Sequence, residues 1–246
     1  MKARTPKWAD QSGFGVRLAW GPSGIDALKD VAVIVLVDLL RFTTALEVAA
    51  ASGASVRPAP WPFDPGLQAD DTEVADGTGP RRLSLSPGSL QNVGSGDRIV
   101  LPSANGSHCS SLAAMTGALV VGACLRNATS VAGYVGIAAR NEAIGIVPCG
   151  ESWPDGTFRP AVEDLIGAGA VVAALGADRG RSPEALAAEG AFGACIGDLM
   201  ATLAESASGR ELRSKGLSGD VAWAAARDVS STVPVLGVDG VYRAGS

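Results

Sequence analysis

The sequence predicts an α/β protein, with a layered α/β/α arrangement and a largely parallel or mixed central sheet. Three observations predict it. Short runs of branched apolar residues recur along the chain, and the run at 31–38 (VAVIVLVD) is continuous, as in strands buried on both faces. Segments of helical character follow most of these runs. Glycines, prolines and polar residues separate the two kinds of segment, which is typical of strand–helix units in a parallel sheet.

The elements before residue 61 follow this alternation. They are, in order, a strand at 14–20, a strand at 31–38, a helix at 43–54 and a short strand at 55–61. Threonines open the predicted helix and Gly53 suits its C-terminal end. Residues 62–96 are rich in Pro, Gly, Asp and Ser and show little periodicity. We expect an irregular excursion there, with loops, a hairpin or a lid.

The alternation resumes after residue 96. The predicted elements are strands at 97–101, 118–123 and 143–149 and helices at 106–117, 127–141 and 160–177. Residues 183–227 are expected to be helical with breaks, and 232–240 to form a closing strand. We therefore expect one α/β domain over residues 1–246, divided at most into two subdomains.

Composition limits the classes of protein and partner. The chain has 246 residues, and 47% of them are hydrophobic, which is enough for a sizeable core. A net charge of −5 argues against nucleic acid as a partner, because phosphate binding on that scale needs a basic face. No apolar run has the length of a membrane span and no secretion signal is recognisable, so we expect a cytoplasmic protein without a membrane partner. The four cysteines are far apart in the sequence and are expected to be buried thiols. A zinc site is improbable because the chain has one histidine and no closely spaced pair of cysteines. The sequence is compatible with a homo-oligomer.

Polar residues gather where four predicted strands end. Ligands of open α/β sheets bind at the carboxyl ends of strands. The four segments are VDLLRFTT (37–44), LPSANGS (101–107), CLRNATS (124–130) and PCGESWPDGTFRPAVED (148–164).

The first segment combines a carboxylate with anion donors. Asp38 can hold a hard cation such as Mg²⁺, and Arg41 offers a planar fork that matches phosphate or sulfonate. Thr43 and Thr44 add hydroxyls at a helix start, where free N–H groups also favour anions. The alternative, with Asp38 as a helix cap and Arg41 in a surface ion pair, has about equal weight from the local sequence.

The second segment is a turn that can surround an anion. Its backbone N–H groups and the side chains of Ser103, Asn105 and Ser107 are candidate donors, and Gly106 suits a backbone position that needs a positive φ. An ordinary capped helix start is the commoner explanation for such a sequence. The spacing excludes a Walker A loop.

The third and fourth segments add a base and two acids. Arg126 and Asn127 repeat the pattern of the first segment at another helix start. Glu163 and Asp164 are adjacent near the start of an apolar helix, so their side chains point about 100° apart. One of them can face a cleft, although a favourable charge at a helix N-terminus explains them about equally well.

The ordered set of motifs resembles a known family. VIVLVDLLRFTTAL, LPSANGS, CLRNATSVA and EDLIGAGAVV occur in the order and with the separations seen in 2-phosphosulfolactate phosphatases. The segment 208–234 also resembles the last part of that family. The resemblance covers roughly residues 14 to 236. It departs from the family pattern at 72–90, where only Ser86-Pro87 of one motif is kept, and at 149–160, so the exact substrate stays open.

The resemblance implies a Mg²⁺-dependent phosphatase that converts 2-phosphosulfolactate to sulfolactate and phosphate, a step towards coenzyme M. Its small anionic phosphorylated substrate would meet catalytic residues Asp38, Arg41, Glu163 and Asp164, with Asp38 and Asp164 as metal ligands. Carried over by motif, the residues that bind substrate would be Thr43, Thr44, Ser103, Asn105, Gly106, Ser107 and Asn127. The local pattern of the third segment adds Arg126 to this set. Either Arg126 or Arg159 could take the sulfonate.

Other mechanisms and functions have less support in the sequence. A covalent aspartyl-phosphate at Asp38 is disfavoured, because the residue two positions on is Leu40 rather than an acid. Cys149 has no histidine nearby in sequence to activate it, and His108 is expected beside the site rather than as its general acid. The alternative from another class is a non-catalytic protein that binds anions or phosphorylated metabolites on the same scaffold.

Overall fold

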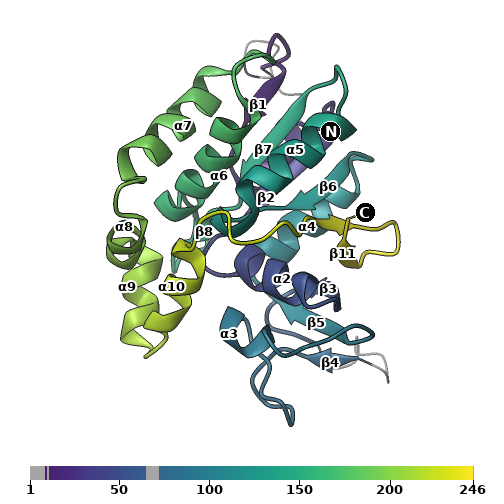
Figure 1. The fold of residues 1–246 in the computed structure, drawn as a ribbon, viewed down its shortest axis with the longest axis vertical. Helices are drawn as coiled ribbons and strands as arrows, with labels where there is room; N and C mark the ends of the chain where they lie inside the picture. Colours follow the sequence, from purple (N-terminus) through teal and green to yellow (C-terminus); the bar gives the residue numbers. More distant parts are fainter. Residues whose placement is uncertain (1–8, 10, 65–71, 246) are drawn as a thin grey trace.

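The computed structural model describes residue 9 and residues 11–64 and 72–245, and a nine-stranded mixed sheet forms its centre (Figure 1). The strand order is β1-β7-β2-β6-β10-β11-β3-β5-β4. The strands are β1 (Val16–Leu18), β2 (Val33–Val37), β3 (Ser55–Ala59), β4 (Glu73–Val74), β5 (Arg98–Pro102), β6 (Leu119–Gly122), β7 (Ile144–Pro148), β10 (Pro234–Leu236) and β11 (Tyr242–Ala244). The predicted α/β class is confirmed.

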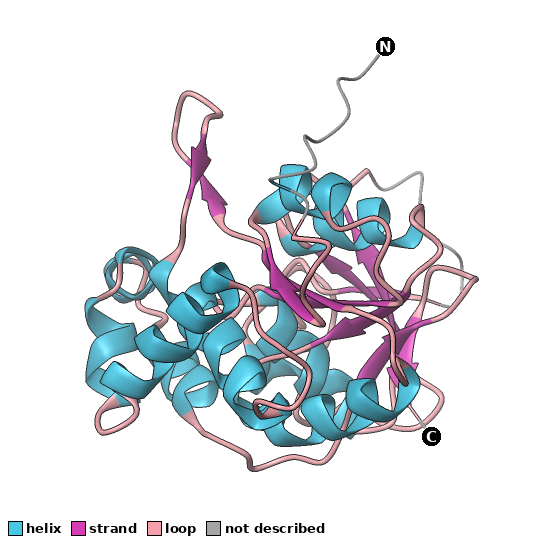
Figure 2. Cartoon of the chain, turned by 90° about the horizontal axis from the view of Figure 1, so that it is seen from above, coloured by secondary structure: helices cyan, strands magenta, loops and turns pink. Residues whose placement is uncertain are grey.

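Helices lie on both sides of the strands (Figure 2). They are α1 (Gly21–Ala27), α2 (Phe42–Ala51), α3 (Pro87–Leu90), α4 (Gly106–Ala114), the 3-10 helix η3 (Leu125–Asn127), α5 (Ala128–Ala138), α6 (Val162–Leu175), α7 (Pro183–Cys195), α8 (Leu199–Glu205), α9 (Ala207–Ser214) and α10 (Ser218–Ala225). Within the described residues, no single helix has the length and apolar character needed to cross a membrane. In the same part of the chain, α7 and α8 pass that test when they are taken together, although they are bent by 109° at their junction.

The strand β2 is the centre of a parallel block. It pairs in parallel with β6 on one side and β7 on the other, and β1 extends the block beyond β7. All five β2 residues are buried, and alternate ones face different cores. Val33, Val35 and Val37 pack in the core that includes α5 and α6. Ile34 and Leu36 pack in the core formed with α1 and α4.

A second parallel block, β3-β5-β4, runs in the opposite direction. The hairpin β10–β11 joins the two blocks through three successive antiparallel pairings. Val235 lies opposite Val121 of the first block, and Tyr242 lies opposite Val56 of the second. Tyr242 is fully buried, with its hydroxyl 2.9 Å from Ser110 Oγ. The closing strand predicted at 232–240 is therefore the first arm of a hairpin.

Three segments differ from the predicted pattern. The helix α1 was not predicted, because its sequence, GPSGIDA, begins with Gly-Pro and carries little periodicity. The excursion at 62–96 contributes β4, which pairs in parallel with β5, and the short helix α3; residues 65–71 lie outside the described part. The segment after Cys149 forms a hairpin of β8 (Glu151–Ser152) and β9 (Phe158–Arg159), which projects from the body in Figure 2.

Candidate active site

Five segments far apart in the sequence meet around a cleft of about 450 Å³. The loop after β2, the excursion after β3, the loop after β5, the hairpin after β7 and the helix α9 all contribute to its wall. Among the residues that line it are Asp38, Arg41, Asp76, Ser103, Asn105, Glu151 and Lys215. Three of the four predicted strand ends, those after β2, β5 and β7, therefore meet in one space, although β5 belongs to the block that runs in the opposite direction.

The turn after β2 is closed by its own hydroxyl groups. Thr43 Oγ1 donates to the Asp38 carbonyl at 2.9 Å and accepts the Asp38 N–H at 3.1 Å. Thr44 Oγ1 donates to the Leu39 carbonyl at 2.8 Å. Both threonines are fully buried, and these bonds hold the start of α2. Their predicted role in phosphate binding stays a prediction, since the hydroxyls bond within the turn.

Asp38 is a buried carboxylate beside the cleft. Its Oδ1 accepts the Phe42 N–H at 3.2 Å. Burial, together with the negative charges of Glu151 and Glu163, raises the pKa of Asp38 to about 7. The charged form of Asp38 is therefore costly unless a positive charge approaches it. Such a perturbed acid in a cleft is typical of functional sites.

The turn after β5 brings the start of α4 against Asp38. The positive φ expected at Gly106 is wrong, and the glycine is needed for space instead. A Cβ atom there would overlap the ring of Phe42 and lie 2.7 Å from Asp38 Oδ2, so only glycine permits this approach. Ser107 Oγ lies 2.6 Å from the carbonyl oxygens of both Ala59 and Ser103, which fixes the turn internally. Ser103 itself lines the cleft.

The adjacent acids at the start of α6 are both buried, but their surroundings differ. Asp164 Oδ1 accepts the Leu39 N–H at 2.7 Å and its Oδ2 accepts the Gly150 N–H at 2.9 Å. Burial, followed by the charges of Asp38 and Glu163, raises the pKa of Asp164. Neither oxygen of Glu163 has a hydrogen-bond partner among the described residues. Asp164 thus ties two loops together, whereas Glu163 keeps its capacity to bind a cation.

Arg41 lines the cleft and is anchored at one nitrogen. Its Nη1 donates to Asp220 Oδ2 at 2.7 Å and to Ser86 Oγ at 3.0 Å. Ser86 Oγ in turn donates to Asp220 Oδ2 at 2.7 Å. The side chain of Arg41 is 19% exposed, so the guanidinium is reachable from the cleft.

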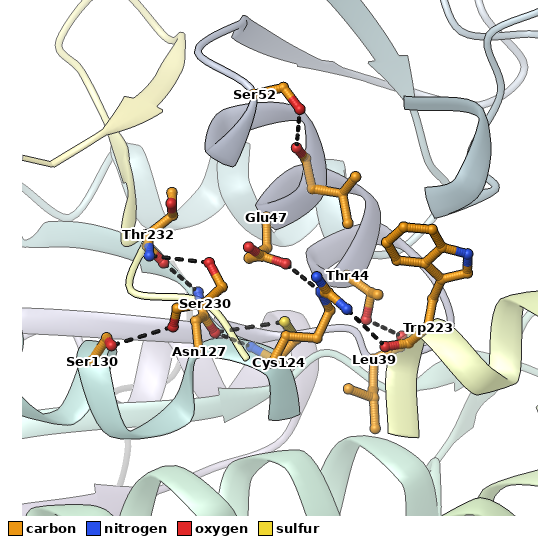
Figure 3. Close-up of polar contacts among 12 residues, drawn as sticks. Leu39, Thr44, Glu47, Ser52, Cys124, Asn127, Ser130, Trp223, Ser230 and Thr232 are labelled. Atoms are coloured by element: carbon orange, nitrogen blue, oxygen red, sulfur yellow. Dashed lines mark hydrogen bonds and ion pairs between the residues drawn. The ribbon is translucent and has the colours of Figure 1, made fainter. Parts of the chain in front are cut away.

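Arg126 and Asn127 are engaged within the protein, and Figure 3 shows Asn127 among its partners. Arg126 Nε pairs with the fully buried Glu47 at 2.5 Å, and the guanidinium lies 5.0 Å from the ring centroid of Trp223. Asn127 Nδ2 donates to the Thr232 carbonyl at 2.9 Å. Neither residue is among the described residues that line the cleft, so we correct the expectation that the third segment joins the other strand ends there.

A second cavity of about 420 Å³ adjoins the cleft. Asn105 Nδ2 donates to Glu151 Oε2 at 2.7 Å, and both residues line both spaces. His108 is exposed and lines the second cavity, together with Trp20 and Phe158. This placement agrees with the expectation that His108 is a neighbour of the site.

The cysteine at the end of β7 is a poor nucleophile in this structure. Cys149 is 2% exposed, and a hydrogen bond with Cys109, followed by burial, raises the pKa of its thiol well above the ordinary value. A nucleophilic cysteine needs a depressed pKa. The environment of Cys149 therefore favours the buried thiol predicted from the sequence.

Comparison with known families decides the assignment. The family model described as 2-phosphosulpholactate phosphatase matches residues 82–238, which is more than half of the chain. The chain belongs to the 2-phosphosulpholactate phosphatase family. No curated protein matches it. The family match runs from α3 to β10 and so includes Ser103, Glu151 and Glu163, while Asp38 and Arg41 precede it.

Within this phosphatase family member, four residues around the cleft were missing from the predicted site. Glu151 lies in the fourth polar segment, 148–164, but it was not selected as a site residue. Ser86, Asp220 and Lys215 carried no local signal of binding, although they lie in or beside stretches that the family resemblance singled out. Only folding brings them together, because α9 and α10 follow the β2 turn by more than 160 residues.

Proposed function

We propose that the chain is a Mg²⁺-dependent phosphatase acting on the phosphate ester of a small acidic 2-hydroxy acid, with 2-phosphosulfolactate as substrate and sulfolactate and phosphate as products. The cleft carries this proposal, because Arg41, Ser103 and the carboxylate of Asp38 line one space. Phosphoryl transfer depends mainly on positioning and on charge neutralisation. Membership of a phosphatase family supports the reaction class.

The acids beside the cleft fit a magnesium ion. Glu163 offers two buried carboxylate oxygens without a partner among the described residues, and Asp38 is close enough for the Glu163 charge to raise its pKa. No three His, Cys, Asp or Glu residues of the described part are arranged to hold a metal by themselves. Mg²⁺ commonly uses one or two carboxylates, completed by water and substrate phosphate. We therefore propose Asp38 and Glu163 as its ligands, with Asp164 positioning the loops around them.

The charge balance of the cleft also favours a cation. In the absence of a bound cation, acidic side chains outnumber basic side chains in the cleft lining, and they would repel a phosphorylated acid. The charged residues that line the cleft are Asp38, Asp76, Glu151, Glu211, Arg41 and Lys215. When bound, Mg²⁺ would neutralise phosphoryl oxygens and orient water.

The protein's own groups would position the ester and stabilise its charge. Arg41 would bind phosphoryl oxygens, and the first N–H groups of α4 would add donors on another side. Glu151 lines the same cleft, and burial raises the pKa of its carboxyl group. Glu151 is therefore placed to give a proton to the ester oxygen as the organic acid leaves.

Two basic residues near α9 are suited to the second anionic group of the substrate. Lys215 lines the cleft directly, where it pairs with Glu211 at 2.6 Å. Arg159 donates from Nη2 to Ser208 Oγ at 3.1 Å, and Ser208 also lines the cleft. We propose that Lys215 and Arg159 select for the sulfonate, a role that Arg126 cannot fill while it pairs with Glu47.

Phosphate release tests the proposal. The chain is incubated with 2-phosphosulfolactate, phospholactate and phosphoglycerate, with Mg²⁺ and with a chelator. We expect Mg²⁺-dependent release that is fastest for 2-phosphosulfolactate. Lys215→Ala should lose activity on the sulfonate ester more than on phospholactate, and Lys29→Ala, on a loop outside the cleft lining, serves as the matched control.

Two outcomes would contradict the proposal. Turnover that is unchanged by the chelator would remove the magnesium requirement. Binding of these esters without turnover of any of them would favour the non-catalytic anion-binding protein. Glu163→Gln separates the metal role from folding: we expect a raised Mg²⁺ requirement without loss of thermal stability, because the variant removes an unpartnered buried charge.

A further inference from the structure

We propose that Asp220 and Ser86 are positioning residues for Arg41, holding one arm of its guanidinium so that the other arm faces the phosphate. This inference rests on the proposed function for the identity of the ligand. The positioning itself follows from contacts between three parts of the chain: the loop after β2, the residue before α3 and the first turn of α10.

The three side chains form a closed triangle. Arg41 Nη1 reaches Asp220 Oδ2 at 2.7 Å and Ser86 Oγ at 3.0 Å, and Ser86 Oγ reaches Asp220 Oδ2 at 2.7 Å. The side chain of Asp220 is only 9% exposed. Charge-assisted hydrogen bonds of this length in a largely buried setting restrict a side chain strongly.

The helix α10 is itself held in place, so Asp220 is a fixed anchor. Trp223 on α10 lies against the guanidinium of Arg126 at 5.0 Å. A Cβ atom at Gly88 would lie 3.2 Å from Trp223 Nε1, which shows how closely α3 and α10 pack. Ser86 directly precedes α3, so this packing sets its distance from Asp220.

The anchoring uses one nitrogen and spares the rest of the fork. Both bonds of Arg41 involve Nη1, and its Nε and Nη2 form no hydrogen bond with any residue in the described part of the chain. Nε and Nη2 together make one edge of the guanidinium, the geometry that binds two oxygens of a phosphate. A donor edge held in one orientation is placed to stabilise the charge that develops on those oxygens during the reaction.

The negative charge of Asp220 allows a positioning role for this residue to be distinguished from a purely structural role. Its carboxylate offsets part of the positive charge of Arg41, which weakens ground-state binding of phosphate. Removing Asp220 should therefore lower kcat through poorer positioning, while KM and the inhibition constant of inorganic phosphate do not rise. A residue that merely supported the fold would weaken turnover and binding together.

Kinetics of four variants test this role. Asp220→Ala should lower kcat by about 10- to 100-fold, the scale of a small misplacement in an active site. Asp220→Asn should lose less, because its amide oxygen can still accept from Arg41 Nη1. Ser86→Ala should cost about 2- to 10-fold, as expected for one neutral hydrogen bond. Asp239→Asn, which breaks the Asp239–Arg243 ion pair outside the cleft lining, should leave kcat unchanged.

A second background shows whether Asp220 acts through Arg41. In Arg41→Lys, which lacks the fork, Asp220→Ala should cost clearly less than it does in the wild type. An equal loss in both backgrounds would overturn the proposal. So would a kcat for Asp220→Ala equal to that of the wild type.

A spectroscopic measurement keeps the test independent of the substrate. The Nε–H resonance of Arg41, assigned by its loss in Arg41→Lys, should shift when wild-type protein is titrated with inorganic phosphate. It should move and broaden in Asp220→Ala and stay in place in Asp239→Asn. If the Arg41 Nε–H resonance is unchanged in Asp220→Ala, the positioning role is overturned. If the resonance behaves as expected but the protein hydrolyses none of the esters, only the proposed function is contradicted.

Discussion

Arg41 and Arg126 follow neighbouring parallel strands, β2 and β6, and each stands at the start of a helix. Both guanidinium groups pair with a carboxylate from a distant part of the chain. Arg41 pairs with Asp220 and lines the cleft. Arg126 pairs with Glu47, whose side chain is completely buried, and lies outside the cleft lining.

The difference comes from the surroundings of the two pairs rather than from the arginines. Glu47 has one oxygen without a partner among the described residues, so Arg126 is the group that makes its burial tolerable. Asp220 and Ser86 occupy one nitrogen of Arg41 and leave the others for a ligand. The same residue type therefore supports the core in one turn and the site in the other.

The largest effect on stability should come from breaking the buried pair. Arg126→Ala leaves Glu47 charged and unpaired, which should lower the free energy of unfolding by about 3–5 kcal/mol. Urea denaturation measures this loss. Turnover per folded molecule should fall far less than it does in Arg41→Ala, because α3 still packs against Trp223 of α10. The double variant Glu47→Leu with Arg126→Met should recover most of the stability. A stable Arg126→Ala protein without turnover would reverse the comparison.

Breaking the cleft pair should affect the reaction instead. Arg41→Ala should lower the rate of phosphate release by about 10²–10³-fold, the usual cost of one well-placed donor to a developing charge. Its thermal unfolding should change less than that of Arg126→Ala, because Asp220 Oδ2 still accepts a hydrogen bond from Ser86 Oγ when Arg41 is removed. Near-wild-type phosphate release by folded Arg41→Ala protein would show that the cleft does not use this arginine.

Two glycines, Gly106 at the start of α4 and Gly133 in α5, differ in the space around them. Gly106→Ala forces a methyl group against Phe42 and Asp38, and should cost about 1–3 kcal/mol as well as activity. Gly133 lies exposed in α5, with nothing within 4 Å of an added Cβ, so Gly133→Ala should stabilise the protein by about 0.4–1 kcal/mol. Thermal unfolding and phosphate release of the two variants check this. Equal changes in stability and in phosphate release for the two variants would mean that the close approach of Gly106 to Asp38 is unimportant.

The exposed pair between Asp239 and Arg243 should have the smallest effect. Asp239→Asn should lower the free energy of unfolding by less than about 1 kcal/mol at neutral pH, because water screens the pair. Arg243 lowers the pKa of Asp239 from 3.8 to about 2. The contribution is therefore present above pH 3.8 and is lost as the pH falls through 2. Denaturation curves of wild type and variant should converge in that range.

Local sequence was sufficient for much of the fold. The run at 31–38 indicated a strand buried on both faces, and alternate residues of β2 do pack into two cores. Burial and helix periodicity are properties of neighbouring residues, so a pattern in the chain can indicate them. The hairpin β10–β11 was only half predicted, because its pairing with β6 and β3 depends on strands more than 110 residues away.

Patterns along the chain were enough to predict the α/β class and most helices and strands, and an ordered set of motifs indicated the family. Which polar residues meet at the cleft depends on the tertiary structure. It separated Arg41 from Arg126, which share a local pattern, and Glu163 from Asp164, which are neighbours in sequence. The physical reason is that each side chain takes its partners from elements that packing brings together. Asp220 and Arg41 meet across 179 positions of the chain, a distance over which no local pattern carries information.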